Sequence, residues 1–219
     1  MLREKLEQIY NILFETWGNQ NWWPGDSDFE IIIGAILTQN TNWLNVEKAI
    51  KNLKAADCFT PEKLCQLDVE KLALLIKPAG YFNVKAKRLK NFLNWFHDEY
   101  HLDIESLTQA PTFSLREQLL SIKGIGPETS DSILLYALEK PVFVVDTYTA
   151  RIMSRHRLIE PDADYEQLKD LFSCLEPDVK FFNEYHALLV RVGKEFCKPK
   201  PRCEICPLNC LEHDIESDY

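Results

Sequence analysis

The sequence lacks long apolar runs, an excess of positive charge and internal repeats. Among 219 residues with 46% apolar content, no run reaches the length of about 18 residues that a membrane span needs, so no membrane segment is expected. The start, MLREKLEQIYNILFE, has the pattern of an amphipathic helix and lacks the continuous apolar core and small-residue cleavage site of a secretory leader. We therefore expect a cytoplasmic, reducing compartment, where thiols bind metals rather than pair.

Charge is unevenly spread along the chain. The formal net charge of −9 argues by itself against a nucleic-acid partner. Basic residues nevertheless gather in KAKRLK, residues 85–90, and again at Lys198, Lys200 and Arg202. Such runs are more often solvated helix faces, but a local basic face on an acidic protein is the alternative.

Apolar residues recur with helical spacing through nearly the whole chain, and proline and glycine separate the periodic segments. The one extended run, VFVV at 142–145, is short and has no partner, so it is expected to be a buried link. The sequence predicts an all-α fold with short connections. The predicted helices are 3–16, 29–38, 44–55, 61–65, 68–76, 83–100, 114–121, 128–138, 147–155, 164–174 and 180–194.

Four of the seven cysteines lie close together in FCKPKPRCEICPLNC, with the spacing C-x5-C-x2-C-x3-C. Four thiolates at short range suit a [4Fe–4S] cluster, each corner of which one cysteine holds. Zinc is the alternative, although a zinc ribbon usually brings two C-x2-C pairs. Free thiols in a loop are a further alternative. The candidate ligands are Cys197, Cys203, Cys206 and Cys210.

Two other segments carry candidate chemistry. In LLSIKGIGPETSD one helix ends, Lys123-Gly124-Ile125-Gly126 forms a tight hairpin, and a second helix starts at Pro127. Two glycines allow positive φ and leave backbone N–H groups beside a helix start, which suits a phosphate oxygen. In VFVVDTYTARI, an apolar run delivers Asp146 to the next helix start. An ordinary connection and a simple helix cap are the structural alternatives.

The order of these segments (helix, KGIG, helix, then VVDTYTAR, then a four-cysteine loop with KPRC) resembles the helix-hairpin-helix DNA glycosylases of the endonuclease III superfamily. The resemblance implies a two-lobed fold with a C-terminal iron–sulfur loop and DNA bound between the lobes. One lobe would be 21–138, and the other 1–20 plus 139–219. It further implies a monomer that acts on double-stranded DNA containing a damaged base, in a bacterial, nucleoid-associated setting.

The resemblance also implies roles for single residues. Asp146 matches the catalytic aspartate, and the hairpin residues Lys123 to Gly126, with Ile125 between the glycines, match the DNA-backbone contact. Gln39 matches a glutamine that fills the gap left by a flipped base, and Tyr81 falls at a wedge position. The four cysteines match the cluster ligands, although this loop is shorter by one residue in the first interval and by two in the last.

One departure bears on mechanism. Members with lyase activity carry a lysine early in the helix after the hairpin, where it attacks the sugar and forms an imine. This chain has Glu128 there, in GIGPETS, and a carboxylate cannot form an imine. The resemblance therefore implies a monofunctional hydrolase.

A second resemblance narrows the substrate. The segments WWP, LTQNT, KPAGYFNVKAKRL, KGIGPETSD and VVDTYT are similar to bacterial endonuclease III-like 3-methyladenine DNA glycosylases, which imply alkylated purines as substrate. In that family the lysine matched by Lys194, after Gly193, is modified to a carbamate. Trp22 and Trp23 could stack on a cationic base, with core packing as their alternative role.

Other functions stay open on this sequence. Within the class they are a glycosylase with lyase activity on oxidised pyrimidines and a mismatch glycosylase. Outside it stands a non-catalytic iron–sulfur DNA-binding protein, for which Asp146 would be dispensable.

Overall fold

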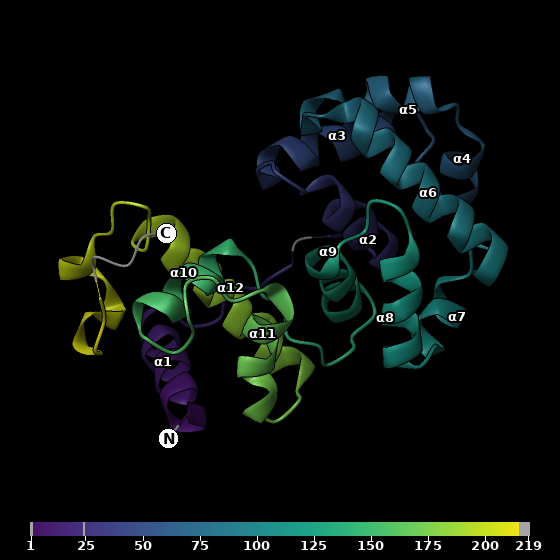
Figure 1. Ribbon diagram of the computed structural model, residues 1–219. Coiled ribbons are helices and arrows are strands. Elements are labelled where there is room, and N and C mark those ends of the chain that lie inside the picture. The colour runs from purple at the N-terminus through teal and green to yellow at the C-terminus, as the bar shows by residue number, and fades with distance from the viewer. Residues whose placement is uncertain (1, 24, 215–219) are drawn as a thin grey trace. The chain divides into compact units, whose positions relative to one another are not determined.

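The computed structural model describes residues 2–23 and 25–214, and no β-strand occurs among them (Figure 1). The predicted all-helical fold is confirmed. Pro24, the last residue of WWP, and the tail after Asp214 lie outside the described residues. No helix in the described part of the chain is both long enough and apolar enough to cross a membrane. The chain divides into two compact units, Pro24–Lys140 and Met1–Trp23 with Pro141–Tyr219.

The unit Pro24–Lys140 is built around α2, Asp28–Leu37, whose side chains are nearly all buried. Ser27 caps this helix by accepting a bond from the backbone N–H of Glu30. The long helix α6, Phe82–Tyr100, contacts α2, α4 and α5 (Figure 1). The remaining elements are α3 (Trp43–Ala55), α4 (Pro61–Gln66), α5 (Val69–Leu75), η1 (Lys77–Ala79), α7 (Ile104–Gln109), α8 (Thr112–Ser121), α9 (Pro127–Ser132) and the π-helical turn η2 (Ile133–Ala137).

The other unit joins the N-terminal helix α1, Leu2–Trp17, to the C-terminal helices. Tyr185 is fully buried in α12, and its hydroxyl donates to the carbonyl of Leu6 at 2.7 Å, which fastens α12 to α1. The stacked rings of Phe143 and Phe172, 3.8 Å between centroids, hold the 142–145 segment in the core. The elements are α10 (Thr147–Arg155), α11 (Tyr165–Asp170), η3 (Leu171–Cys174), α12 (Val179–Glu195), η4 (Cys203–Ile205) and η5 (Pro207–Cys210).

Most predicted helices are found within a few residues of their predicted limits. The link 142–145 is buried and has no strand partner, as expected. The helix α7 was not predicted, because it is one short turn and a half with a single buried apolar residue, Leu107, and so has no periodicity to detect. The segments predicted as 128–138 and 164–174 each change helix type partway, into a π turn and a 3-10 turn.

Candidate functional site

The hairpin has the predicted outline: α8 ends at Ser121 and α9 begins at Pro127. Its two glycines differ, however. Gly124 has φ of +103°, and a Cβ there would lie 2.4 Å from Cγ of Arg88. Gly126 has φ of −96°, and a Cβ there would meet no atom within 4 Å. The expectation of positive φ thus holds for Gly124 only, which is fixed by internal packing, whereas Gly126 borders open space.

The two other hairpin residues also differ in exposure. Lys123 is exposed, and its carbonyl accepts a bond from Asn91 Nδ2 at 2.8 Å. Ile125 is buried, and its backbone N–H donates to the carbonyl of Ile122 at 3.0 Å. Any contact of Ile125 with a ligand would therefore come from its main chain.

Gln39 belongs to the same surface as the hairpin. Its Nε2 donates to the carbonyl of Gly124 at 3.1 Å and to Oγ1 of Thr129 at 2.9 Å. Its Oε1 accepts a bond from Nη1 of Arg88. All these polar atoms have protein partners, so the amide braces the hairpin.

Tyr81 stands out by its exposure. It precedes α6 with φ of +44° in the left-handed region, and 74% of its surface is exposed. An aromatic ring held out from a tight turn is an unusual use of a large side chain, because such rings are normally packed. The wedge role that the resemblance assigns to Tyr81 stays a prediction.

The run KAKRLK is mainly structural, which corrects the hypothesis of a basic face. Lys85 is buried, and Lys90 donates to the carbonyls of Leu64, Cys65 and Leu67 at the end of α4. These cations satisfy backbone acceptors that would otherwise lack partners. In this run only Lys87 is exposed. Helical spacing turns one side of the run inward, which composition alone does not reveal.

Asp146 caps α10, in the unit formed by the chain's two ends. Its Oδ1 accepts bonds from the backbone N–H of Thr149 at 2.7 Å and from its hydroxyl at 3.0 Å. Nε2 of His186, a buried residue of α12, lies 3.6 Å from Oδ2. Burial has the largest influence on the pKa of Asp146 and would raise it, but His186 and Thr149 outweigh burial, so the pKa lies below that of an ordinary aspartate. The Asp146 side chain is 11% exposed, so its carboxylate is charged and largely shielded from water.

His186 was not singled out from the sequence. It lies forty residues after Asp146 in HALLV, within an otherwise apolar stretch. No local motif joins the two positions, since only the packing of α10 against α12 does. Gly193 shows how close that packing is, because a Cβ there would lie 2.4 Å from Cδ1 of Tyr148.

Trp22, Trp23 and Lys194, the predicted base pocket, are neighbours. The two indole rings meet edge-on, 5.5 Å between centroids, and Nζ of Lys194 lies 5.6 Å from the ring centre of Trp22. The indole N–H of Trp22 is buried and has no hydrogen-bond acceptor within the described residues. It is therefore a donor that a bound ligand could use.

Glu128 is exposed in the first turn of α9, directly after Pro127. A carboxylate there has a favourable interaction with the helix dipole. It lies in the unit with the hairpin, Gln39 and Tyr81, whereas Asp146, His186 and the tryptophans lie in the other unit.

The cysteine segment follows α12 directly. Cys197 is buried, and its Sγ accepts a bond from Nη1 of Arg155 at 3.2 Å. Cys197, Cys203 and Cys206 line one cavity, while Cys210 is exposed. Burial raises the pKa of Cys203 and of Cys206, and in both the neighbouring thiols add to the rise.

The arrangement of the thiols is not that of a closed metal site in the described part of the chain. Within residues 2–23 and 25–214, no three side chains of His, Cys, Asp or Glu are arranged so that they could hold a metal ion. The fold brings three of the thiols to one cavity, but their sulfur atoms are not arranged as ligands of one metal centre. The donor set itself suits the group, because thiolates at Cys203 and Cys206 would repel the neighbouring sulfurs and a cationic centre would relieve that repulsion, and Arg155 already donates to Cys197.

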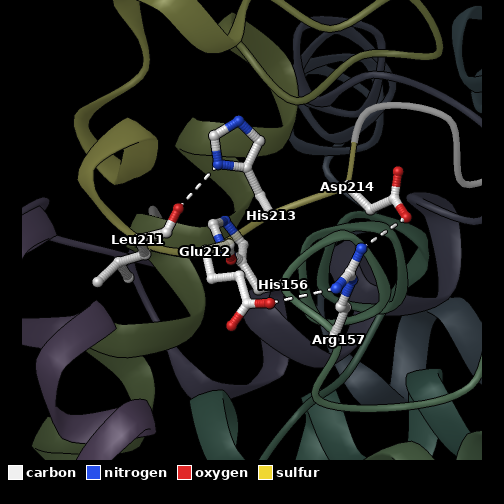
Figure 2. A network of polar contacts seen from close by, with 6 residues as sticks. All are labelled: His156, Arg157, Leu211, Glu212, His213 and Asp214. Atoms are coloured by element: carbon white, nitrogen blue, oxygen red, sulfur yellow. Dashed lines mark hydrogen bonds and ion pairs between the residues drawn. The ribbon is translucent and has the colours of Figure 1, made fainter.

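The segment after the cysteines is fixed to the end of α10 (Figure 2). Arg157 donates to carboxylate oxygens of Glu212 and Asp214, both at 3.2 Å. Nδ1 of His156 lies 2.9 Å from the carbonyl of Glu212, and the backbone N–H of Asp214 donates to the carbonyl of Arg155 at 2.7 Å. The helix that Asp146 starts is thus tied at its other end to the cysteine segment.

The hairpin and Asp146 both lie within a stretch of the chain that matches a known family. Residues 33–177 match the family described as HhH-GPD superfamily base excision DNA repair protein. The match covers more than half of the chain, so the chain belongs to this family of base excision repair DNA glycosylases, as the resemblance implied.

Individual relatives agree. A protein of Methanocaldococcus jannaschii, provisionally named a DNA repair glycosylase, is 47% identical over 212 residues, which cover 95% of this chain and 96% of that protein. Endonuclease III of Rickettsia conorii is 29% identical over 92% of this chain and 93% of its own. Because the first of these relatives is archaeal, the comparisons do not support the expected bacterial setting.

Solved structures agree on the fold. The 3-methyladenine DNA glycosylase MagIII of H. pylori, solved with 1,N6-ethenoadenine, has a TM-score of 0.74 and 30% identity, over 89% of this chain and 97% of that one. An endonuclease III–DNA covalent intermediate has a TM-score of 0.81 at 20% identity, over 95% and 94% of the two chains. The second likeness concerns the fold alone.

Proposed function

We propose that this protein is a monofunctional DNA glycosylase that hydrolyses the N-glycosidic bond of an alkylated purine in double-stranded DNA. The observation that carries the proposal is Asp146, a largely shielded carboxylate whose pKa is held below its ordinary value by His186 and Thr149. A carboxylate that stays charged while shielded from water can stabilise a cation strongly, because the surrounding dielectric is low.

The reaction needs that stabilisation. When the bond between the base and C1′ breaks, the base leaves with the bonding electron pair and the sugar becomes an oxocarbenium-like cation. Asp146 lies against this cation, orients a water whose oxygen bonds to C1′, and receives the proton that the water loses. A purine methylated at a ring nitrogen such as N3 starts with a positive charge and leaves neutral, so for this class of lesion the leaving group needs no separate acid.

Glu128 supports hydrolysis without strand cleavage. A lyase needs an amine that forms an imine with C1′. By the resemblance, Glu128 stands where the lyase relatives carry that amine, and its carboxylate cannot form the imine. The likeness to the 3-methyladenine DNA glycosylase MagIII, at 30% identity and solved with 1,N6-ethenoadenine, supports a modified purine as the substrate.

Base selection falls to Trp22, Trp23 and Lys194. A flipped cationic purine would stack on an indole face, where the attraction between cation and ring adds to burial. The buried N–H of Trp22 has no acceptor in the described part of the chain and would bond to the base edge.

DNA contact falls to the hairpin and to the two turns near it. Gly126 borders open space, so a phosphate can approach its backbone closely, and Lys123 adds an exposed cation. Tyr81 would enter the base stack as a wedge, and Gln39, which braces the hairpin, would face the orphaned base.

The four cysteines would hold a [4Fe–4S] cluster, with zinc as the alternative. When bound, the cluster would supply structural cross-linking of the loop that carries Lys198, Lys200 and Arg202. The chain's own contribution is Arg155, whose Nη1 donates to Sγ of Cys197 at 3.2 Å and to the carbonyl of Lys198 at 2.7 Å.

Base release from a panel of duplexes tests the proposal. The panel contains N3-methyladenine, 1,N6-ethenoadenine, an oxidised pyrimidine and a mismatch, each with wild type and with Asp146→Asn. Release from the alkylated purines alone, lost in the variant, is the expected result. Release of oxidised pyrimidines with strand nicking would establish the endonuclease III-type activity instead, and no release from any duplex would favour a non-catalytic binding protein.

A further inference from the structure

Three polar residues of α6 are spaced at i, i+3 and i+6: Lys85, Arg88 and Asn91. Residues three apart lie on the same side of a helix, so these three form one stripe. Together they reach three connections between helices of the unit Pro24–Lys140: the turn after α2 that carries Gln39, the turn after η1 that carries Tyr81, and the hairpin. These three connections lie far apart along the chain.

Lys85 reaches two of these turns. Lys85 is 1% exposed, and its Nζ donates to the carbonyls of Leu37 at 2.8 Å and of Ala79 at 2.7 Å. Leu37 comes two residues before Gln39, and Ala79 comes two residues before Tyr81. One ammonium group therefore joins the backbones that present Gln39 and Tyr81.

Arg88 and Asn91 hold the third segment, the hairpin. Nη1 of Arg88 donates to Oε1 of Gln39, and the Arg88 side chain occupies the space that a Cβ on Gly124 would take. Nδ2 of Asn91 donates to the carbonyl of Lys123. The stripe thus fastens both turns and the hairpin to a single helix.

Burying the ammonium group of Lys85 costs desolvation free energy. Burial, with a smaller contribution from the charge of Arg88, lowers the pKa of Lys85 to about 8. An apolar side chain would avoid this desolvation, but it would leave two backbone carbonyls without a donor. The lysine is therefore explained by what its carbonyl partners position.

We propose that Lys85, supported by Arg88 and Asn91, is a positioning residue that sets the Tyr81 and Gln39 turns at a fixed separation for entry into damaged DNA. The DNA part of this inference rests on the proposed function. The positioning part concerns the free protein and can be measured without DNA.

The experiment compares Lys85→Met with Lys140→Met. Lys140 is a matched control: its residue is 8% exposed, and Nζ donates to the carbonyls of Thr108 at 2.9 Å and Ala110 at 2.6 Å. Its carbonyl partners lie far along the chain from Gln39 and Tyr81. Amide hydrogen exchange is measured on the free proteins. Faster exchange at 38–42 and 79–82 in Lys85→Met, but not in Lys140→Met, is expected.

DNA binding gives the second readout. Affinity is measured for a duplex with a tetrahydrofuran abasic analogue and for the intact duplex. Lys85→Met should lose about tenfold of the preference for the abasic duplex, equal to about 1.4 kcal/mol, while Lys140→Met keeps it. In a Tyr81→Ala background, Lys85→Met should change the preference by clearly less than tenfold, because the part of its effect that acts through the Tyr81 turn is already lost.

Each adverse outcome has a distinct meaning. Equal exchange at both turns in Lys85→Met and Lys140→Met would overturn the positioning role, whatever the DNA result. A wild type without any preference for the abasic duplex would sink the proposed function, while exchange still decides the positioning role. If Lys85→Met does not fold, Asn91→Ala replaces it, and faster exchange confined to 122–126 is the expected result. Unchanged exchange there would overturn the stripe.

Discussion

Replacing Asp146 by asparagine separates its two roles, cap and charge. The Oδ1 atom accepts from the backbone N–H and the hydroxyl of Thr149, and an asparagine side-chain oxygen can accept the same bonds. Asparagine caps helices about as well as aspartate. The free energy of unfolding of Asp146→Asn should therefore lie within about 0.5 kcal/mol of the wild-type value. Asp146→Ala loses both bonds and should cost about 1 kcal/mol.

Activity should follow charge rather than capping. Losing a single charge-stabilising group at a reacting centre typically costs on the order of 100-fold or more in rate. Both variants should therefore lose at least about 100-fold in single-turnover release of N3-methyladenine. Urea unfolding and base release on the same preparations provide the two measurements. Near-wild-type release by Asp146→Asn would show that the residue is only a cap.

The pH dependence supplies a further check. Because the folded pKa of Asp146 is lowered, the unfolded state binds more protons as pH falls, and the charged aspartate stabilises the fold above the ordinary carboxyl pKa. This contribution is lost as pH falls from that ordinary value through the lower folded value. Wild type should lose stability relative to Asp146→Asn across that acidic range. Parallel pH profiles for the two proteins would contradict the assignment.

Three further predictions concern the hairpin, the lyase position and the cysteines. Gly124→Val should destabilise the fold by about 2 kcal/mol or more, because of the positive φ at this position and the contact with Arg88. Gly126→Val should have the melting temperature of wild type but bind every duplex about tenfold more weakly. Equal melting temperatures for the two variants would refute the distinction. Borohydride should trap no imine with wild type, and Glu128→Lys should gain weak nicking; a trapped wild-type imine would overturn the hydrolase assignment. Anaerobically purified protein should contain iron and absorb visible light, both lost in Cys203→Ser, and zinc without iron would overturn the cluster.

The sequence by itself determined most of the helices and the order of the motifs. Helical periodicity is a local property, so it predicted the helices that have a continuous apolar stripe. Glycine and proline mark the hairpin because their backbone limits are also local. The position of Asp146 at a helix start followed from the same local signals, and its capping bonds to Thr149 confirm that position.

The tertiary structure alone decided which polar groups meet. The run 85–90 has the composition of a basic face, but helix packing turns Lys85 inward to carbonyls that lie 48 and 6 residues away along the chain. His186 meets Asp146 only because α10 packs against α12, and Gln39 meets Gly124 across 85 residues. Such contacts depend on which helix faces are buried against each other, and that is a property of the whole packed core, which no local pattern encodes.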